Sequence, residues 1–320
     1  MNAIEIEALT KHYTTGFWRP RPYLALDRLT LSVPQGEVFG FLGPNGAGKT
    51  TTLKLLMQLI YPTSGRAEIL GKPLGDITVK RRIGYLPEQP YFYDYLTAEE
   101  LLAYFAALFG ADAAAARTRV AALLDEVGIG AERRLQLRKF SKGMLQRVGI
   151  AQALINQPEI VFFDEPMSGL DPLGRREIRE LILRLRDRGC TVFFSSHVLA
   201  DAEALCSRVA VMANGRLSAA GKLSDLVAFQ VRGWELVIRG LPDAALEQAQ
   251  RLGHVVRATK LGEGRYALEL PLSPPPDRTL AEMIGQGADL VSLNPVRETL
   301  EDFFVQQVAA STPRGSVDVA

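Results

Sequence analysis

The segment from residue 43 to residue 51 has the residue types and spacing of a phosphate-binding loop. It contains the pattern G-x-x-x-x-G-K-[ST], which ends at Lys49 and Thr50. Glycines let backbone N–H groups converge on phosphate oxygens, the lysine reaches the β- and γ-phosphates, and the threonine hydroxyl is a ligand for Mg²⁺. We therefore expect MgATP to be held by Gly43, Pro44, Asn45, Gly46, Ala47, Gly48, Lys49, Thr50 and Thr51.

Two acidic residues, Asp164 and Glu165, directly follow the apolar run Ile160 to Phe163. A carboxylate beside a dry core is costly unless it is paired or lies near a metal. We expect Asp164 to join Thr50 in the Mg²⁺ shell and Glu165 to activate the attacking water. The alternative, in which Asp164 only caps the turn before Pro166, leaves Glu165 unexplained.

His197 is a third polar residue that follows a predicted strand, Thr191 to Ser195. A lone histidine is more often a hydrogen-bonded structural residue than a functional one. In open parallel sheets, however, ligands bind outside the carboxyl ends of the strands, so polar chemistry at neighbouring strand ends indicates one shared site. We expect Lys49, Glu165 and His197 to be the catalytic group of that site.

The elements that position these residues alternate between strands and helices. The predicted strands are rich in β-branched and aromatic residues and apolar on both faces, as buried parallel strands require: Val38 to Leu42, Ile160 to Phe163 and Thr191 to Ser195. The helices that follow them are predicted at Lys49 to Ile60, Pro172 to Arg188 and Val198 to Cys206. The Met1 to Thr10 segment alternates in the manner of a further strand. This order predicts an α/β fold.

Strand patterns are absent between Leu86 and Phe140, which predicts an inserted helical subdomain at about residues 87–157. Thr97 and Glu100 match a capping box that opens a helix ending at Phe109. Helix propensity favours two further helices, over the alanine-rich stretch Ala111 to Ala122 and then to Val127.

After about Val231 the pattern becomes β-α-β-β-α-β, the order of a ferredoxin-like α+β domain. Its predicted elements are Trp234 to Arg239, Pro242 to Leu252, Val255 to Thr259, Tyr266 to Leu270, Asp277 to Ile284 and Leu290 to Leu293. A last helix is predicted at Val296 to Val308. We divide the chain into a nucleotide-binding domain at 1–228, an accessory domain of structural or regulatory role at 229–309 and a disordered tail at 310–320.

Composition and charge exclude several classes of protein. The 320 residues include 37 basic and 36 acidic ones, and the formal charge of +1 provides no field for wrapping nucleic acid. Cys190 and Cys206 have no partner pattern and are typical of small buried residues in a reducing compartment. The most apolar stretch, Leu101 to Ala116, is too short to span a bilayer, and the N-terminus has no export signal.

The segment at 140–147, Phe-Ser-Lys-Gly-Met-Leu-Gln-Arg, precedes the Asp164 strand and resembles the signature sequence of ABC-type ATPases. The resemblance covers residues 3 to about 225 and implies a P-loop NTPase fold with an ABC-ATPase core. Lys142 and Met144 stand where the commonest signature has glycine and glutamine, and the variant is similar to that of ABC-2-type exporter ATPases. Nucleotide contacts are implied for Tyr13, Gln89, Ser141, Gly143 and Asp171, with Gln89 also at the metal.

The resemblance assigns adenine stacking to Tyr13. The loop that follows, Gly16 to Tyr23, is long and aromatic, so Phe17 and Trp18 are alternative platforms. We choose Tyr13.

The same resemblance implies partners. In a head-to-tail homodimer, Ser141 and Gly143 of one subunit would close over the ATP held by Lys49 of the other. Ser141 has the position of an N-cap, which would direct a helix N-terminus towards the anion. A separate integral-membrane permease would export the substrate, with this chain cytoplasmic and peripheral at the inner face of the cell membrane.

Two alternatives stay open in the sequence. The first is an ABC ATPase with a non-transport role in a nucleic-acid, ribosome or iron–sulphur assembly machine, which the single P-loop and the absence of a basic stripe disfavour. The second concerns the aromatic segment Tyr91 to Tyr95, which suits either a protein interface or the core of the helical subdomain.

Overall fold

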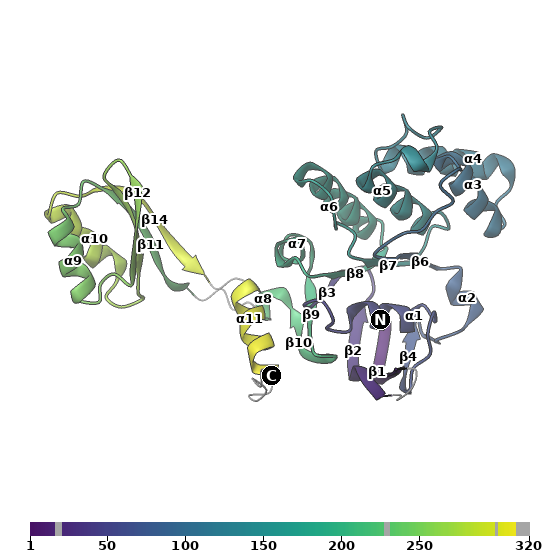
Figure 1. Ribbon diagram of the computed structural model, residues 1–320, viewed down its shortest axis with the longest axis horizontal. Helices are drawn as coiled ribbons and strands as arrows, with labels where there is room; N and C mark the ends of the chain where they lie inside the picture. Colours follow the sequence, from purple (N-terminus) through teal and green to yellow (C-terminus); the bar gives the residue numbers. More distant parts are fainter. Residues whose placement is uncertain (17–20, 227–230, 298–299, 312–320) are drawn as a thin grey trace. The chain divides into compact units, whose positions relative to one another are not determined.

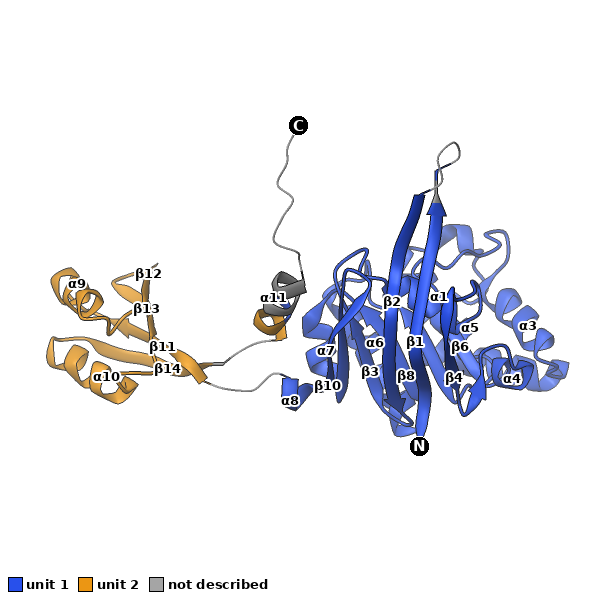
Figure 2. Ribbon diagram, turned by 90° about the horizontal axis from the view of Figure 1, so that it is seen from below, with its two compact units in different colours: residues 1–226, 304–320 blue, residues 227–303 orange. Residues whose placement is uncertain are grey.

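The computed structural model of the protein describes residues 1–16, 21–226, 231–297 and 300–311. The chain forms two compact units: unit 1 comprises residues 1–226 and 304–320, and unit 2 comprises residues 227–303 (Figure 2). The domain boundary predicted at 228, the alternative platforms Phe17 and Trp18, and the tail beyond 311 lie outside the described residues.

The main sheet of unit 1 has six strands in the order β10-β9-β3-β8-β7-β6 (Figure 1). Their bounds are β3 Val38–Leu42, β6 Ile83–Leu86, β7 Ile160–Asp164, β8 Thr191–Ser196, β9 Arg208–Ala213 and β10 Arg216–Lys222. All neighbours pair in parallel except β10, which is antiparallel to β9. Every residue of β3, β7 and β8 is buried, which explains why these three strands, predicted correctly, are apolar on both faces.

Five helices in the described part of unit 1 flank or follow these strands: α1 Lys49–Leu56, α2 Ile77–Lys80, α6 Pro172–Asp187, α7 Leu199–Leu205 and α8 Leu223–Leu226. The prediction that the first of them runs to Ile60 was wrong. Gln58 has a φ of 55°, a left-handed conformation that an α-helix cannot continue through, so α1 ends before it.

The predicted helical subdomain contains α3 Ala98–Leu108, α4 Ala113–Glu126, the 3₁₀ turn Leu137–Lys139 and α5 Lys142–Ala153. The capping box is confirmed, because Glu100 N–H donates to Thr97 Oγ1 at 3.2 Å and Thr97 N–H donates to the Glu100 carboxylate at 2.8 Å. The prediction of two helices over residues 111–127 was wrong. Asp112 caps a single helix, and its apolar stripe is continuous from Ala116 to Leu124.

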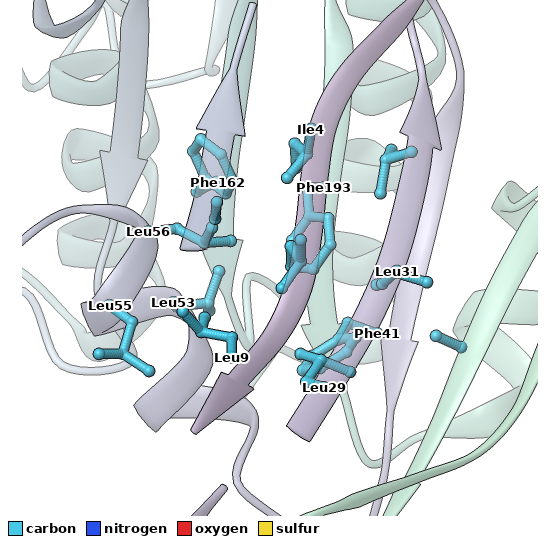
Figure 3. Close-up of a cluster of buried hydrophobic side chains, with 14 of the residues drawn as sticks. Ile4, Leu9, Leu29, Leu31, Phe41, Leu53, Leu55, Leu56, Phe162 and Phe193 are labelled. Carbon is cyan, nitrogen blue, oxygen red and sulfur yellow. The ribbon is translucent and has the colours of Figure 1, made fainter. Parts of the chain in front are cut away.

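A second sheet in unit 1, ordered β2-β1-β4-β5, is antiparallel and was not predicted as a sheet. Its strands are β1 Asn2–Thr15, β2 Arg21–Pro34, β4 Ser64–Ile69 and β5 Lys72–Pro73. The alternation seen at the N-terminus places Ile4 and Ile6 in the core. Figure 3 shows Ile4 and Leu9 together with Leu53 of α1 and with Phe162 and Phe193 of the main sheet, so both sheets and α1 share one core.

Unit 2 is an antiparallel sheet of order β12-β13-β11-β14 with two helices on one face (Figure 1). Its elements are β11 Val231–Arg239, α9 Asp243–Arg251, β12 Arg257–Gly262, β13 Arg265–Leu270, α10 Pro276–Gly285 and β14 Asp289–Arg297. The order is the predicted β-α-β-β-α-β, and the strand arrangement is that of a ferredoxin-like sheet. Leu236, Ile238 and Leu268 of the sheet pack with Leu246 of α9 and Met283 of α10.

The last helix, α11, spans Leu300–Ser311, and the prediction that it begins at Val296 was wrong. Val296 pairs with Gly233 in the sheet, so its apolar side chain belongs to the end of β14. The division between the two units falls at Phe304, within α11, and not at residue 309. No helix in the described part of the chain is long and apolar enough to cross a membrane.

Candidate functional site

A cavity of about 470 Å³ lies at the carboxyl ends of β3, β7 and β8. This volume is within the usual range for small-molecule sites. Residues 44–51 line the cavity together with Glu165 and His197, and Tyr13, Tyr23 and Glu88 complete much of its wall. The strand ends that the sequence singled out therefore meet at one site.

The loop between β3 and α1 depends on two glycines. Gly48 has a φ of 100°, and a Cβ there would lie 2.8 Å from the Ala25 carbonyl oxygen. A Cβ on Gly43 would lie 2.8 Å from the Met212 carbonyl oxygen. Because only glycine fits, the loop turns tightly into α1, and the unpaired N–H groups of that helix lie at the cavity.

Lys49 is a buried cation at the base of the cavity, with a relative exposure of 6%. Its Nζ donates to the carbonyl oxygens of Gly43, at 2.7 Å, and Pro44, at 3.3 Å. It also lies 3.5 Å from Glu165 Oε1. The structure thus pairs the lysine of the loop with the second acid of the β7 end, residues 116 positions apart in the sequence.

Glu165 lies between Lys49 and His197. Its Oε2 is 2.9 Å from His197 Nδ1, and its backbone adopts a φ of 54° at the turn after β7. The Glu165 N–H donates to Ser195 Oγ at 3.1 Å, and the buried Gln146 side chain donates to the Pro166 carbonyl at 3.0 Å. A non-glycine residue in this conformation is uncommon and is held here by the surrounding hydrogen bonds.

Asp164 is fully buried at the end of β7. Burial raises the pKa of its carboxyl group, hydrogen bonds from the Ser195 and Thr50 hydroxyls lower that pKa, and the charges of Glu88 and Glu165 raise it further. Ser195 Oγ donates to Oδ1 at 2.6 Å, whereas Oδ2 has no well-oriented partner among the described residues. A buried carboxylate oxygen that has no well-oriented donor and lies beside a threonine hydroxyl fits a divalent cation.

No group of three His, Cys, Asp or Glu side chains in the described part of the chain could hold a metal alone. A cation at Asp164 would therefore need Thr50, water and the nucleotide as further ligands. That is the usual environment of Mg²⁺ in nucleotide sites.

Five residues predicted to contact the nucleotide do not line the cavity: Gly43, Gln89, Ser141, Gly143 and Asp171. Gln89 is exposed, and its neighbour Glu88 lines the wall in its place. Asp171 caps α6, where its carboxylate accepts from Gly174 N–H at 2.8 Å. Ser141 caps α5 as expected, accepting from Met144 N–H at 3.2 Å.

Several residues of the site were not predicted from the sequence. Tyr23 pairs with Tyr13 across β1 and β2, and both line the cavity. Ser195 links Asp164 to the Glu165 backbone. The Lys142 side chain lies against Gly169 of its own chain, where a Cβ would be 2.8 Å from Lys142 Nζ. Ser195 carries a hydroxyl group one residue before the end of β8, the strand that pairs with β7 next to Asp164. That position was the available sequence signal for a role in the site.

Comparison with known proteins identifies the family to which this chain belongs. The model of the family described as ABC transporter matches residues 26–168. A Synechocystis protein, described as an uncharacterised ABC transporter ATP-binding protein, is 45% identical over 96% of this chain and 85% of its own length. The chain belongs to the ABC transporter ATP-binding family. It is accordingly an ATPase with the P-loop ABC fold.

Two further likenesses agree with this family. The bacitracin transport ATP-binding protein of Bacillus licheniformis is 35% identical over 90% of this chain and 94% of its own length. A dimeric ATP-binding cassette solved in a post-hydrolysis state with ADP and Pi is 27% identical, with a TM-score of 0.64 over 69% of this chain and 98% of that one. This ABC ATPase is thus the ATP-binding subunit of a transporter.

Replacing either tyrosine of the cavity wall should weaken ATP binding. We expect Tyr13→Ala and Tyr23→Ala each to raise the Kd for ATP by about three- to tenfold, because aromatic stacking is worth about 0.5–1.5 kcal/mol. Titration with a fluorescent ATP analogue measures this change. Tyr104→Ala is the matched control, since Tyr104 is 51% exposed, like Tyr23, but lies on α3. Unchanged affinity in both single variants and in the double variant would exclude this wall as the adenine platform.

Proposed function

We propose that this ABC ATPase powers export as a head-to-tail homodimer bound to a separate membrane permease. The observation that carries the proposal is the single cavity in which Lys49 lies 3.5 Å from Glu165 and Glu165 lies 2.9 Å from His197. A lysine for the γ-phosphate, a carboxylate for water and a histidine on that carboxylate are the groups that phosphoryl transfer to water requires.

In this proposal each residue of the site has one task. Lys49 and the N–H groups of residues 44–51 bind the phosphates, and His197 orients the Glu165 carboxylate. Glu165 accepts a proton from the attacking water as that water adds to the γ-phosphorus and the bond from that phosphorus to the β-phosphate oxygen breaks, which releases ADP and phosphate. Asp164 and Thr50 would hold Mg²⁺, which would neutralise charge on the phosphate oxygens.

A second copy of the chain would complete the site. Ser141 and Gly143 carry the family's signature yet lie outside the cavity of their own chain, and Ser141 is exposed. Because Ser141 caps α5, the N-terminus of this helix has the partial positive charge that suits the γ-phosphate of a partner. The dimeric ADP- and Pi-bound relative supports such an assembly. Asp171 would act at the same interface.

The permease would dock at the aromatic segment, which we define as Tyr91, Phe92, Tyr93 and Tyr95. Tyr91 is 99% exposed, Tyr93 58% and Tyr95 60%, so packing within the helical subdomain does not account for the tyrosines. They border a hollow of about 500 Å³ that also contacts Leu137 and Phe140. Exposed aromatic residues around a hollow are typical of protein interfaces.

Transport is the role that the names of the relatives favour, including the bacitracin transport protein, over a nucleic-acid, ribosome or iron–sulphur role. Export is the direction that we propose. Docking of this chain to a permease gives it a peripheral position at the cytoplasmic face of the cell membrane.

Removing the aromatic segment should separate docking from ATP binding. The measurement uses cells that produce the protein naturally. We expect the amount of protein in the supernatant, separated from the membrane pellet, to be at least about tenfold higher for Tyr91→Ala/Tyr93→Ala than for the parent, because interface aromatics are common hot spots. Purified variant protein should bind MgATP as the parent does. Tyr104→Ala, on α3, is the control. Equal membrane retention of the parent and the double variant would place the permease contact elsewhere.

A further inference from the structure

The sheet of unit 2 has one covered face and one open face. Side chains that alternate towards α9 and α10 form the buried cluster around Leu236, Ile238 and Leu268. Both helices lie on the same face of the sheet (Figure 1). The alternate positions of β11 and β13 lie on the opposite face, where no described helix of unit 2 packs. They include Glu235 and Arg239 on β11, both exposed.

The charges on this open face form two rows of opposite sign. Glu235 lies directly opposite Glu269 across β11 and β13, and Arg239 lies directly opposite Arg265. The acidic row and the basic row are four residues apart on each strand, about 13 Å at the usual rise. Like charges directly opposite each other destabilise an isolated sheet.

Neighbouring charges within the unit relieve this repulsion only in part. Arg257 lies opposite Glu269, Arg239 Nη2 is 3.0 Å from Asp289 Oδ2, and Arg265 is 3.6 Å from Glu263. All four side chains of these two ion pairs are well exposed, with side-chain exposures from 47% to 86%. Exposed pairs of this kind contribute little to stability.

Small side chains separate the two charged rows. Val237 is opposite Ala267, and Thr259 and Ser292 extend the same row to the two edge strands. A row of short side chains lets two sheets approach to the usual spacing of about 10 Å. The open face therefore has a central row of small side chains that can pack closely, with the acidic row on one side of it and the basic row on the other.

We propose that two copies of the chain associate through these open faces. A two-fold axis between the sheets and perpendicular to the strands places the Glu235–Glu269 row of one copy on the Arg239–Arg265 row of the other, and the reverse. The Val237–Ala267 pairs then meet at the axis. A two-fold axis parallel to the strands would oppose rows of like charge, so the charge pattern selects one isologous arrangement.

This contact is small and independent of the ATP-dependent dimer. Four strands about 4.8 Å apart and about 20 Å long present a plane of roughly 400 Å², at the low end for a specific interface. Its effect is to raise the effective concentration of two ATP-binding units for each other, as linked binding sites do.

Charge exchange tests the proposal in the full-length chain without nucleotide, in a Lys49→Ala background that removes the loop lysine. Sedimentation equilibrium over a micromolar concentration series should show a weak dimer. Glu235→Arg/Glu269→Arg and Arg239→Glu/Arg265→Glu should each raise the dimer dissociation constant at least about tenfold, because like charges then face each other. An equimolar mixture of the two should form heterodimers with the parent's affinity.

Two further variants serve as controls. Glu247→Arg/Asp187→Arg makes the same change in net charge as Glu235→Arg/Glu269→Arg, at exposed positions off this face, and should leave the dissociation constant unchanged. If either double variant fails to fold by circular dichroism, the variant carrying all four exchanges, which interchanges the charges of the two rows on the central strands β11 and β13, should dimerise as the parent does. A monomeric parent over the whole series, dimerisation of both double variants as in the parent, or a mixture no better than its components would overturn the proposal.

Discussion

Glu165→Gln should abolish most ATP hydrolysis and leave MgATP binding intact. We expect kcat to fall by about 10²- to 10⁴-fold, the usual contribution of a positioned general base. The amide keeps the shape of the carboxylate that lies 2.9 Å from His197 Nδ1, but it cannot accept the proton of the attacking water. Phosphate release measures the first effect, and titration with a fluorescent ATP analogue measures the second.

The same variant should trap the closed dimer with MgATP. Light scattering after size exclusion should show a monomer without nucleotide and a dimer with MgATP, at a protein concentration low enough that the open-face contact of unit 2 does not form. Glu180→Gln is the matched control, because Glu180 is an exposed acid on α6 that does not line the cavity. If MgATP-bound Glu165→Gln stays monomeric, a permease or another chain is needed to complete the site.

Lys49→Ala should lose nucleotide binding itself. We expect the Kd for ATP to rise by about 10- to 100-fold, because hydrogen bonds to charged groups contribute about 1.5–3 kcal/mol each. The substitution also leaves Glu165 without the cation that lies 3.5 Å from its Oε1 inside the cavity. Lys54→Ala is the control, since Lys54 is an exposed residue of the same helix. Equal losses of ATP affinity in Lys49→Ala and Glu165→Gln would contradict the separate roles that we propose.

Lys49→Ala also provides a test of the head-to-tail arrangement. Ser141→Arg should block the interface over the partner's nucleotide, so that neither variant hydrolyses ATP alone. A mixture should recover activity, because in the mixed dimer an intact Lys49 from one chain faces an intact Ser141 from the other. Mixed dimers that form, as shown by cross-linking, but remain inactive would argue against sites shared between the two subunits.

Short-range patterns in the sequence were sufficient for much of this protein. The phosphate-binding loop, the caps at Thr97 and Ser141 and the strands β3, β7 and β8 depend on residues a few positions apart, and all lie where the sequence predicted. The β-α-β-β-α-β order of unit 2 was predicted in the same way. These features follow from hydrogen bonds and hydrophobic periodicity that act within one element.

Only the tertiary structure decided which side chains meet. Ser195 reaches Asp164 because β7 and β8 pair in parallel register, and Tyr23 joins Tyr13 because β1 and β2 form a long hairpin. The same holds in unit 2, where the pairing of β11 with β13 sets Glu235 beside Glu269. A one-residue change in strand register would move each of these side chains to the other face without altering the local pattern. The sequence by itself therefore determined the elements and the chemistry of the loop, and the register between distant strands determined the composition of the site.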